Sequence, residues 1–381
     1  MFLSTISWCE VNQVPYQKVE TMNSEVTPQP ATSVPSAVNW FRVAWFLGLA
    51  FGLAWLVDLA LFLSGGLANP STGLLFQFQM LLPAFSAMLL GAFFFKDSPI
   101  FYRSNRGASR WFVYFYFLLT GLYLIGSIVS LIQPALGTTI PSLLLIPNFL
   151  GLILLVVLRM KGGKNTFVDA GMAGGKARIW FGYGLGLVVF FGLQTWLNYF
   201  FKLGTVVDLK TAFPQLGTSN LPTTTLMFSI ALNTVIIGPF LGLIISFGEE
   251  YGWRGFLQTE LIRLGRIRGV LLLGIIWGIW HWPVIWMGYN YPDQPVLGSV
   301  FMVAYCIILA YFLAYAVFKS KGIWTAAYLH ALNNQTLSFF VLAVVAPTST
   351  LYSFGMGLPA LLLGAIVVLL LLRDPVWKET E

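Results

Sequence analysis

Ten runs of about twenty apolar residues follow one another along the chain, separated by shorter polar stretches. Each run is long enough to cross the roughly 30 Å hydrocarbon core of a bilayer as an α-helix. Helices are expected because lipid offers backbone groups no other partners, and no run alternates as the strands of a membrane barrel do. The runs cover approximately residues 43–63, 74–95, 111–132, 140–158, 179–201, 226–247, 270–286, 296–318, 323–345 and 356–372.

This pattern predicts an all-α fold, a polytopic bundle of about ten transmembrane helices. Residues 1–39 are polar and lack the apolar stretch of a signal peptide, so a disordered N-terminal tail is expected there. Residues 40–225 then supply five helices, residues 226–345 the candidate catalytic core with the polar stretches described below, and residues 346–381 a final helix with a short tail.

Composition and charge agree with a membrane protein. Hydrophobic residues make up 57% of the chain and charged residues 9%, against about 25% charged in soluble domains. In the ten-helix topology, only Lys202 and Lys210 of the 21 basic residues lie opposite the N-terminus, which predicts cytoplasmic termini. This asymmetry accounts for the net charge of +7 without a nucleic-acid partner. Cys9 and Cys306 do not form a plausible disulfide framework.

Few polar side chains fall inside the apolar runs, and because they are costly in a membrane they are the first candidates for function. Asp58 lies in the first run, and Glu249 with Glu250 closes the sixth. The chain has two histidines, His281 and His330, and both lie in apolar runs.

The stretch 248–258 reads GEEYGWRGFLQ and carries the two glutamates. On a helix, Glu250 and Arg254 are one turn apart and close enough to pair. Glu249 points about 100° away from its neighbour, so its carboxylate stays free to act as a base. A charged cap at a cytoplasmic helix end is the alternative interpretation.

The stretch 277–283 reads WGIWHWP and carries His281. Pro283 is expected to kink this helix and free a backbone carbonyl, which a membrane tolerates where protein or a water-filled cavity satisfies it. The alternative is a histidine that is hydrogen-bonded to a neighbouring helix and has no catalytic role.

The stretch 322–334 reads GIWTAAYLHALNN and places His330 and Asn334 one turn apart on the same face. An imidazole and an amide in this arrangement offer two donors for a developing oxyanion. Polar side chains of this kind also join helices in membrane bundles, which is the alternative here.

Together the three stretches resemble the CPBP intramembrane proteases, the family of type II CAAX prenyl endopeptidases and bacteriocin-processing and self-immunity proteins. The family's motifs are E-E-x-x-x-R, F-x-x-x-H and H-x-x-x-N, and the resemblance covers about residues 226–345. Trp277 stands where the second motif has phenylalanine, and we expect its packing role to persist. The matching residues are Glu249, Glu250, Arg254, His281, His330 and Asn334.

The resemblance implies an endopeptidase that acts within the membrane on embedded or lipid-modified substrates, such as prenylated peptides. It implies that Glu249 and His281 activate a water molecule, while His330 and Asn334 hold the tetrahedral oxyanion. It also implies a bacterial cytoplasmic membrane as the location, with the lipid bilayer as surroundings.

The resemblance further implies that Glu250 and Arg254 pair to orient the first carboxylate. No cofactor is expected. A Zn²⁺ site made by Glu249, His281 and His330 is the alternative, since two histidines and a glutamate form a catalytic zinc site in other enzymes. The chain lacks H-E-x-x-H, which favours a metal-independent mechanism.

Functions of other classes stay open. The same helices suit a non-catalytic membrane scaffold, a bacteriocin immunity protein, or a transporter in which carboxylates and histidines relay protons. The motifs are not repeated in the first half of the chain, which argues against a transporter built from symmetric repeats. For a protease, we expect the polar residues to meet in one cavity in the cytoplasmic half of the bilayer. We also expect the helix before the glutamates to tilt, or to break near Gly238 and Pro239, so that the glutamates are carried inward.

Overall fold

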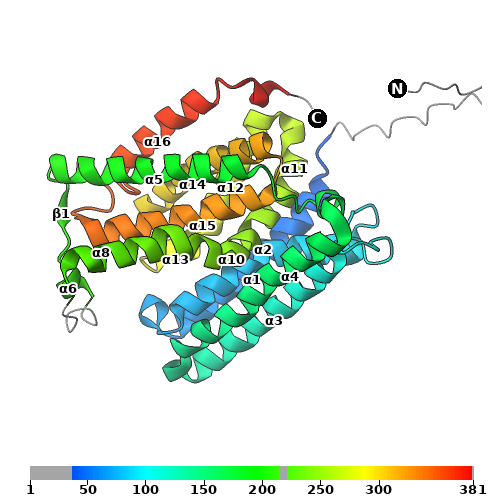
Figure 1. Cartoon of the computed structure of the whole chain (residues 1–381), viewed down its shortest axis with the longest axis horizontal. Helices are drawn as coiled ribbons and strands as arrows, with labels where there is room; N and C mark the ends of the chain where they lie inside the picture. The colour runs from blue at the N-terminus through cyan, green and yellow to red at the C-terminus, as the bar shows by residue number, and fades with distance from the viewer. Residues whose placement is uncertain (1–36, 214–220, 380–381) are drawn as a thin grey trace, which may run out of the picture. The chain divides into compact units, whose positions relative to one another are not determined.

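The computed structural model describes residues 37–213 and 221–379, and this part of the chain is almost entirely helical (Figure 1). The predicted tail, residues 1–39, lies outside the described residues except for its last three. The helices up to residue 212 are α1 (Trp40–Leu63), α2 (Thr72–Leu89), α3 (Ser109–Ile132), α4 (Thr139–Asp169), α5 (Ala177–Phe200) and α6 (Leu209–Ala212). Those after residue 222 are α8 (Thr223–Ala231), α9 (Gly238–Leu241), α10 (Leu243–Glu250), α11 (Gln258–Leu261), α12 (Arg266–Trp280), α13 (Trp282–Trp286), α14 (Pro295–Ser320), α15 (Ile323–Phe339) and α16 (Leu358–Leu371).

Seven helices in the described part of the chain are long and apolar enough to cross a membrane. They are Trp40–Leu63, Thr72–Phe94, Ser109–Ile132, Thr139–Gly162, Ala177–Phe200, Thr223–Leu241 and Pro295–Ser320. The other three predicted spans correspond to α12, α15 and α16, which have 15, 17 and 14 residues and are shorter than a full span. The chain is therefore a multi-pass helical protein, and the count of ten spans stays a prediction.

The helix that carries the glutamates is broken, as the sequence suggested. After α8, residues Leu232–Ile237 form a wide π-type turn, and a second interruption at Gly242 separates α9 from α10. Pro239 lies in the first turn of α9, where a missing N–H is tolerated. The resulting short helix α10 packs against α2 and α15 and is buried along its whole length.

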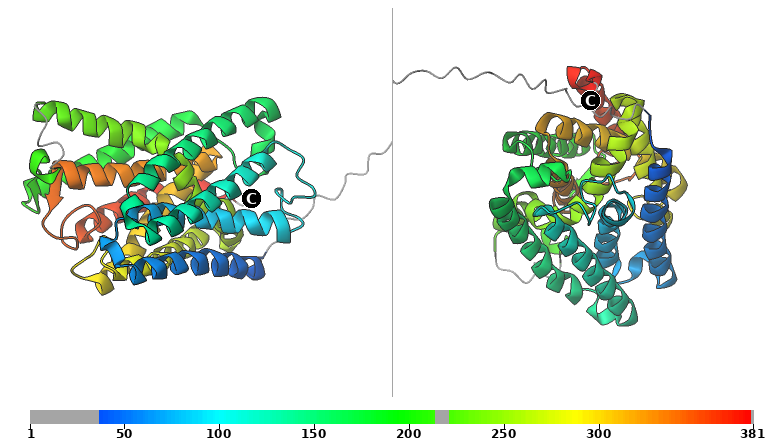
Figure 2. Two further views of the ribbon diagram at one scale, coloured as in Figure 1. Left: turned by 90° about the horizontal axis from the view of Figure 1, so that it is seen from below. Right: turned by 90° about the vertical axis from the view of Figure 1, so that its right-hand side faces the viewer.

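Close packing of α10 on α2 depends on two glycines. A Cβ atom on Gly248 would lie 2.4 Å from the carbonyl oxygen of Met80, and one on Gly252 would lie 2.4 Å from Cβ of Pro83. Both distances are too short for any larger side chain. These glycines bring the backbone that carries Glu249 directly against α2, while α1, α4 and α16 lie at the periphery (Figure 2).

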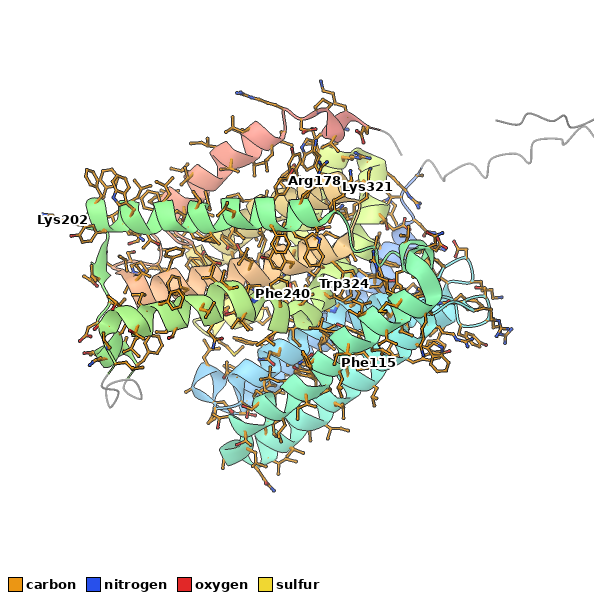
Figure 3. The ribbon with its side chains drawn as sticks, in the orientation of Figure 1. Phe115, Arg178, Lys202, Phe240, Lys321 and Trp324 are labelled. Atoms are coloured by element: carbon orange, nitrogen blue, oxygen red, sulfur yellow. The ribbon has the colours of Figure 1, made fainter. Side chains whose placement is uncertain are left out.

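The two ends of the bundle differ in charge. Arg178 and Lys321 lie at the end that contains the start of α1, and Lys202 lies at the other end (Figure 3). We call these the basic end and the opposite end. The opposite end holds the only strands in the described residues, β1 (Gly204–Val206) and β2 (Val345–Pro347), which pair antiparallel with Thr205 facing Ala346.

Ion pairs join elements at the basic end. The Asp374 carboxylate, just beyond α16, accepts hydrogen bonds from the backbone N–H of Val376, from the Lys319 ammonium at 2.9 Å and from the Tyr315 hydroxyl at 2.8 Å. These donors, the backbone N–H foremost, lower the pKa of Asp374 to about 2. The C-terminal segment is thereby held against α14.

Candidate active site

A cavity of about 440 Å³ lies between α2, α10, α12, α14 and α15. Four of the six predicted site residues line it: Glu249, His281, His330 and Asn334. The remaining two, Glu250 and Arg254, lie behind the cavity wall and are fully buried. The three sequence stretches therefore meet in one place, although about 80 residues separate the first from the last.

The Glu249 carboxylate is held by two indoles. Its Oε2 accepts hydrogen bonds from Nε1 of Trp277 at 2.7 Å and from Nε1 of Trp253 at 3.3 Å. Among the described residues, Oε1 has no hydrogen-bond partner, and Glu249 lines the cavity. One carboxylate oxygen is thus fixed while the other is free to meet a ligand or water.

Trp277 consequently does more than the phenylalanine it replaces in the motif. Its indole N–H makes the shorter of the two bonds to Glu249, and its ring lies 4.3 Å from the Arg254 guanidinium. The rings of His281 and His330 contact it as well, with centroids 5.9 Å and 5.5 Å away. Trp277 lies at the centre of the site and contacts Glu249, Arg254 and both histidines.

Glu250 has a second partner that the sequence did not suggest. It pairs with Arg254 at 2.9 Å as expected, but the same oxygen, Oε1, also accepts from Nδ1 of His330 at 2.8 Å. Glu249 receives no hydrogen bond from this pair, since two tryptophans hold it instead. The Glu250–Arg254 pair therefore orients His330, and the expectation that it orients the Glu249 carboxylate is not met.

His281 lies where α12 ends. Its backbone N–H turns to the carbonyl of Gly278, which leaves the Trp277 carbonyl without a helical donor. That carbonyl accepts from Nδ1 of His281 at 2.8 Å, and because a carbonyl only accepts, Nδ1 carries the hydrogen. Nε2 of His281 is then unprotonated in the neutral ring and can accept a proton.

Asn334 is oriented by two residues that the sequence analysis missed. Tyr305 donates to Oδ1 of Asn333 at 3.1 Å, and Nδ2 of Asn333 donates to Oδ1 of Asn334 at 3.0 Å. Because its oxygen is occupied, Asn334 presents its NH₂ group as the free end. Asn333 follows His330 by three residues, so the helical spacing that singled out Asn334 applied to it too.

Asp58, singled out in the first apolar run, is buried beside the site and does not line it. Its Oδ2 accepts from Nε2 of Gln79 at 2.9 Å, and Gln79 does line the cavity. The first span is thereby joined to the cavity wall. Gln79 gave no signal in the sequence, because a single glutamine in an apolar run belongs to none of the motifs.

The proposed metal ligands do not form a metal centre as arranged. Within residues 37–213 and 221–379, no three His, Cys, Asp or Glu side chains are grouped to hold an ion. Cys306 approaches His281, with Sγ 3.8 Å from Nδ1, but that nitrogen already bonds the Trp277 carbonyl. Glu249, His281 and His330 are therefore not grouped to fit a zinc ion in this geometry.

Comparison with known families identifies the part of the chain that carries this site. Residues 231–336 match the family described as Type II CAAX prenyl endopeptidase Rce1-like. This segment is an Rce1-like domain. It contains all six predicted site residues and is consistent with the CPBP resemblance. No curated protein and no solved structure matches the chain.

The family assignment places the Rce1-like domain among CAAX-type membrane proteases. With seven helices able to span a bilayer, the chain is a multi-pass membrane protein. The match ends at residue 336 and begins at residue 231, so the first five helices and α16 lie outside it.

Proposed function

We propose that this protein is an intramembrane endopeptidase that hydrolyses a peptide bond of membrane-embedded or lipid-modified substrates with water activated by Glu249. The observation that carries the proposal is a carboxylate with one free oxygen, two imidazoles and an amide donor around a single cavity. The Rce1-like family supports the same class of reaction.

In the proposed first step, a water molecule between Glu249 and His281 attacks the substrate carbonyl carbon. Glu249 takes the proton through its free oxygen, with Nε2 of His281 accepting the second hydrogen bond of the water. The two indoles that hold Oε2 fix the orientation of the carboxylate and so the position of the attacking water. A carboxylate without these bonds would lose conformational entropy when it adopts the same orientation.

The carbonyl oxygen becomes an oxyanion, for which the site offers two donors. The NH₂ group of Asn334 is the first. Nε2 of His330 is the second, and since Nδ1 already donates to Glu250, Nε2 donates only when the ring is an imidazolium. The buried Glu250 carboxylate stabilises that charged ring. The intermediate then collapses, the C–N bond breaks, and the proton held by Glu249 passes to the leaving amine.

The test is cleavage of a library of membrane-embedded and prenylated peptides by the purified protein. Glu249→Gln keeps size and hydrogen bonding but removes basicity, so peptides should still bind while turnover falls by roughly 10² to 10⁴ fold. Asn334→Ala should cost about 10² to 10³ fold. Asp293→Asn is the matched control, because it removes an exposed carboxylate that does not line the cavity.

A non-catalytic scaffold or immunity protein predicts a different pattern. Such a protein would bind peptides and leave them intact, and Glu249→Gln would change neither binding nor product. Peptide binding without cleavage by the unmodified protein would therefore reject the endopeptidase.

A further inference from the structure

The cavity extends from the site toward the opposite end of the bundle. Beyond the site, its walls continue through Tyr289 and Asn290 after α13, Ser338 on α15, and Ser349 and Thr350 after β2. These residues lie at the opposite end, where β1 and β2 pair and where α14 begins. None of the lining residues belongs to the described loops of the basic end.

Buried side chains close the cavity toward the basic end. Trp253 and the Glu250–Arg254 pair follow Glu249 along the chain in that direction and are almost inaccessible to solvent. Phe247 stacks on Trp324 with centroids 4.2 Å apart, and Figure 3 places Trp324 near the end that carries Lys321. The distance is long as well, since α12 runs 15 residues, about 22 Å, from Arg266 to the residue before His281.

Charge indicates which side of the membrane each end faces. Among the described residues, nearly all lysines and arginines lie on the basic end, and only Lys202 and Lys210 belong to the opposite end. Arg254 belongs to neither, because it is buried beside Glu250. An excess of lysine and arginine marks the cytoplasmic loops of a membrane protein. By this rule the opposite end is the non-cytoplasmic one.

We infer that substrate enters the cavity from the non-cytoplasmic side of the membrane, so that this protein acts on exported peptides or on peptide segments exposed at the outer surface. The inference rests on the proposed endopeptidase activity and specifies its substrate class. Cytosolic lipid-modified proteins, whose cleavage site would lie at the basic end, have no path to Glu249 in this arrangement.

The lining also restricts the chemistry of the peptide. Along the mouth, the polar side chains are the uncharged Asn290, Asn334, Ser338, Ser349 and Thr350. No lysine or arginine lines the cavity in the described chain, so its mouth offers no cationic side chain to a substrate carboxylate. The cavity suits an internal, uncharged stretch of peptide with amides that these side chains can hydrogen-bond.

The first experiment measures access without depending on activity. Three Ser→Cys variants are made in a Cys9→Ser background and labelled in sealed vesicles with a membrane-impermeant maleimide. Ser338→Cys reports the cavity, Ser64→Cys the opposite end and Ser104→Cys the basic end. The three are matched, because each hydroxyl is exposed or partly exposed and donates to a nearby backbone carbonyl. The background protein, which retains Cys306, gives the blank.

We expect Ser338→Cys and Ser64→Cys to be labelled from the non-cytoplasmic side, and Ser104→Cys only from the cytoplasmic side. Labelling of Ser338→Cys from the cytoplasmic side would overturn the inference, whichever control variants are labelled from that side. Protection of Ser338→Cys from both sides would overturn it too, since the cavity would then have no aqueous mouth.

The second experiment joins access to cleavage. A fluorogenic peptide of uncharged residues, attached to a phospholipid head group that keeps it in one leaflet, is added to vesicles of known orientation. Cleavage should occur when the end marked by Ser64 faces the peptide and be lost when the vesicles are inverted. Cleavage only from the Ser104 side would overturn the entry route while the endopeptidase stands. If the labelling is as expected but no cleavage occurs from either side, the endopeptidase activity is rejected while the inferred entry route stays supported.

Discussion

Trp277→Phe tests whether the indole N–H positions the catalytic carboxylate. The substitution restores the residue of the family motif and keeps an aromatic ring beside Arg254 and both histidines. It removes the 2.7 Å hydrogen bond to Oε2 of Glu249 and leaves only the 3.3 Å bond from Trp253. The carboxylate then rotates more freely within the cavity.

Two effects of this change oppose each other. Losing a donor makes the carboxylate a stronger base, which favours proton uptake from water. Losing its fixed direction costs more, because a misplacement of about 1 Å lowers rates by about 10² fold. A hydrogen bond to a charged group contributes about 1.5–3 kcal/mol, which sets the same scale of about 10- to 150-fold. We expect kcat to fall by about 10- to 100-fold with KM nearly unchanged.

The assay is steady-state cleavage of a peptide that the unmodified protein cuts, measured well below the unfolding temperature of each variant. Trp253→Phe is the matched control, since it removes the longer bond to the same oxygen and should lower kcat by a smaller factor. An unchanged or higher kcat in Trp277→Phe would refute the reasoning, because basicity would then outweigh position. An equal fall in kcat in both variants would show that the shorter hydrogen bond does not contribute more than the longer one.

Three further predictions concern stability and metal. Arg254→Ala removes the arginine partner of the fully buried Glu250 carboxylate and should lower the free energy of unfolding by about 3 to 5 kcal/mol. A variant that is active and as stable as the unmodified protein in thermal denaturation would contradict burial of the pair. Gly252→Ala should destabilise by about 1 to 3 kcal/mol through its clash with Pro83, whereas Gly121→Ala in α3, with no atom within 4 Å of the new Cβ, should be neutral or stabilising. Chelators should leave cleavage intact, and loss restored by Zn²⁺ would instead establish a metal enzyme.

The sequence predicts the helices well because the membrane imposes one strong rule. Apolar runs long enough to cross a bilayer must be helical, and each of the ten runs coincides with helical structure. The site residues were also readable, since ionisable groups in such runs are few. Glu249, His281, His330 and Asn334 line one cavity, as their placement on apolar helices suggested.

Hydrogen-bond partners between helices were not readable. Helical spacing fixes which residues of one helix face the same way, and it correctly paired Glu250 with Arg254. It does not say which face of another helix comes opposite. The bonds from Trp277 to Glu249 and from His330 to Glu250 each join residues more than twenty positions apart, so only the packed structure reveals them.

The end of the bundle toward which the cavity extends could not be read from the sequence for a related reason. The histidines were placed by counting residues from the basic helix ends, which measures depth but not access. Access depends on what fills the space on either side, and large side chains such as Trp253 and Trp324 fill the basic side. Counting along one helix cannot detect a seal that is made by side chains of another.

Helix ends inside the bundle explain how a polar site persists among apolar spans. α12 stops at Trp280 and α15 widens into a π-type turn at Phe340, so both histidine helices are shorter than a full span. An ended helix leaves carbonyls without donors, which lipid cannot satisfy but a protein cavity can. At the end of α12, the free carbonyl of Trp277 takes the His281 imidazole and fixes its tautomer. The interruption that would be costly against lipid therefore orients an imidazole of the site, and it can exist only where a cavity replaces lipid.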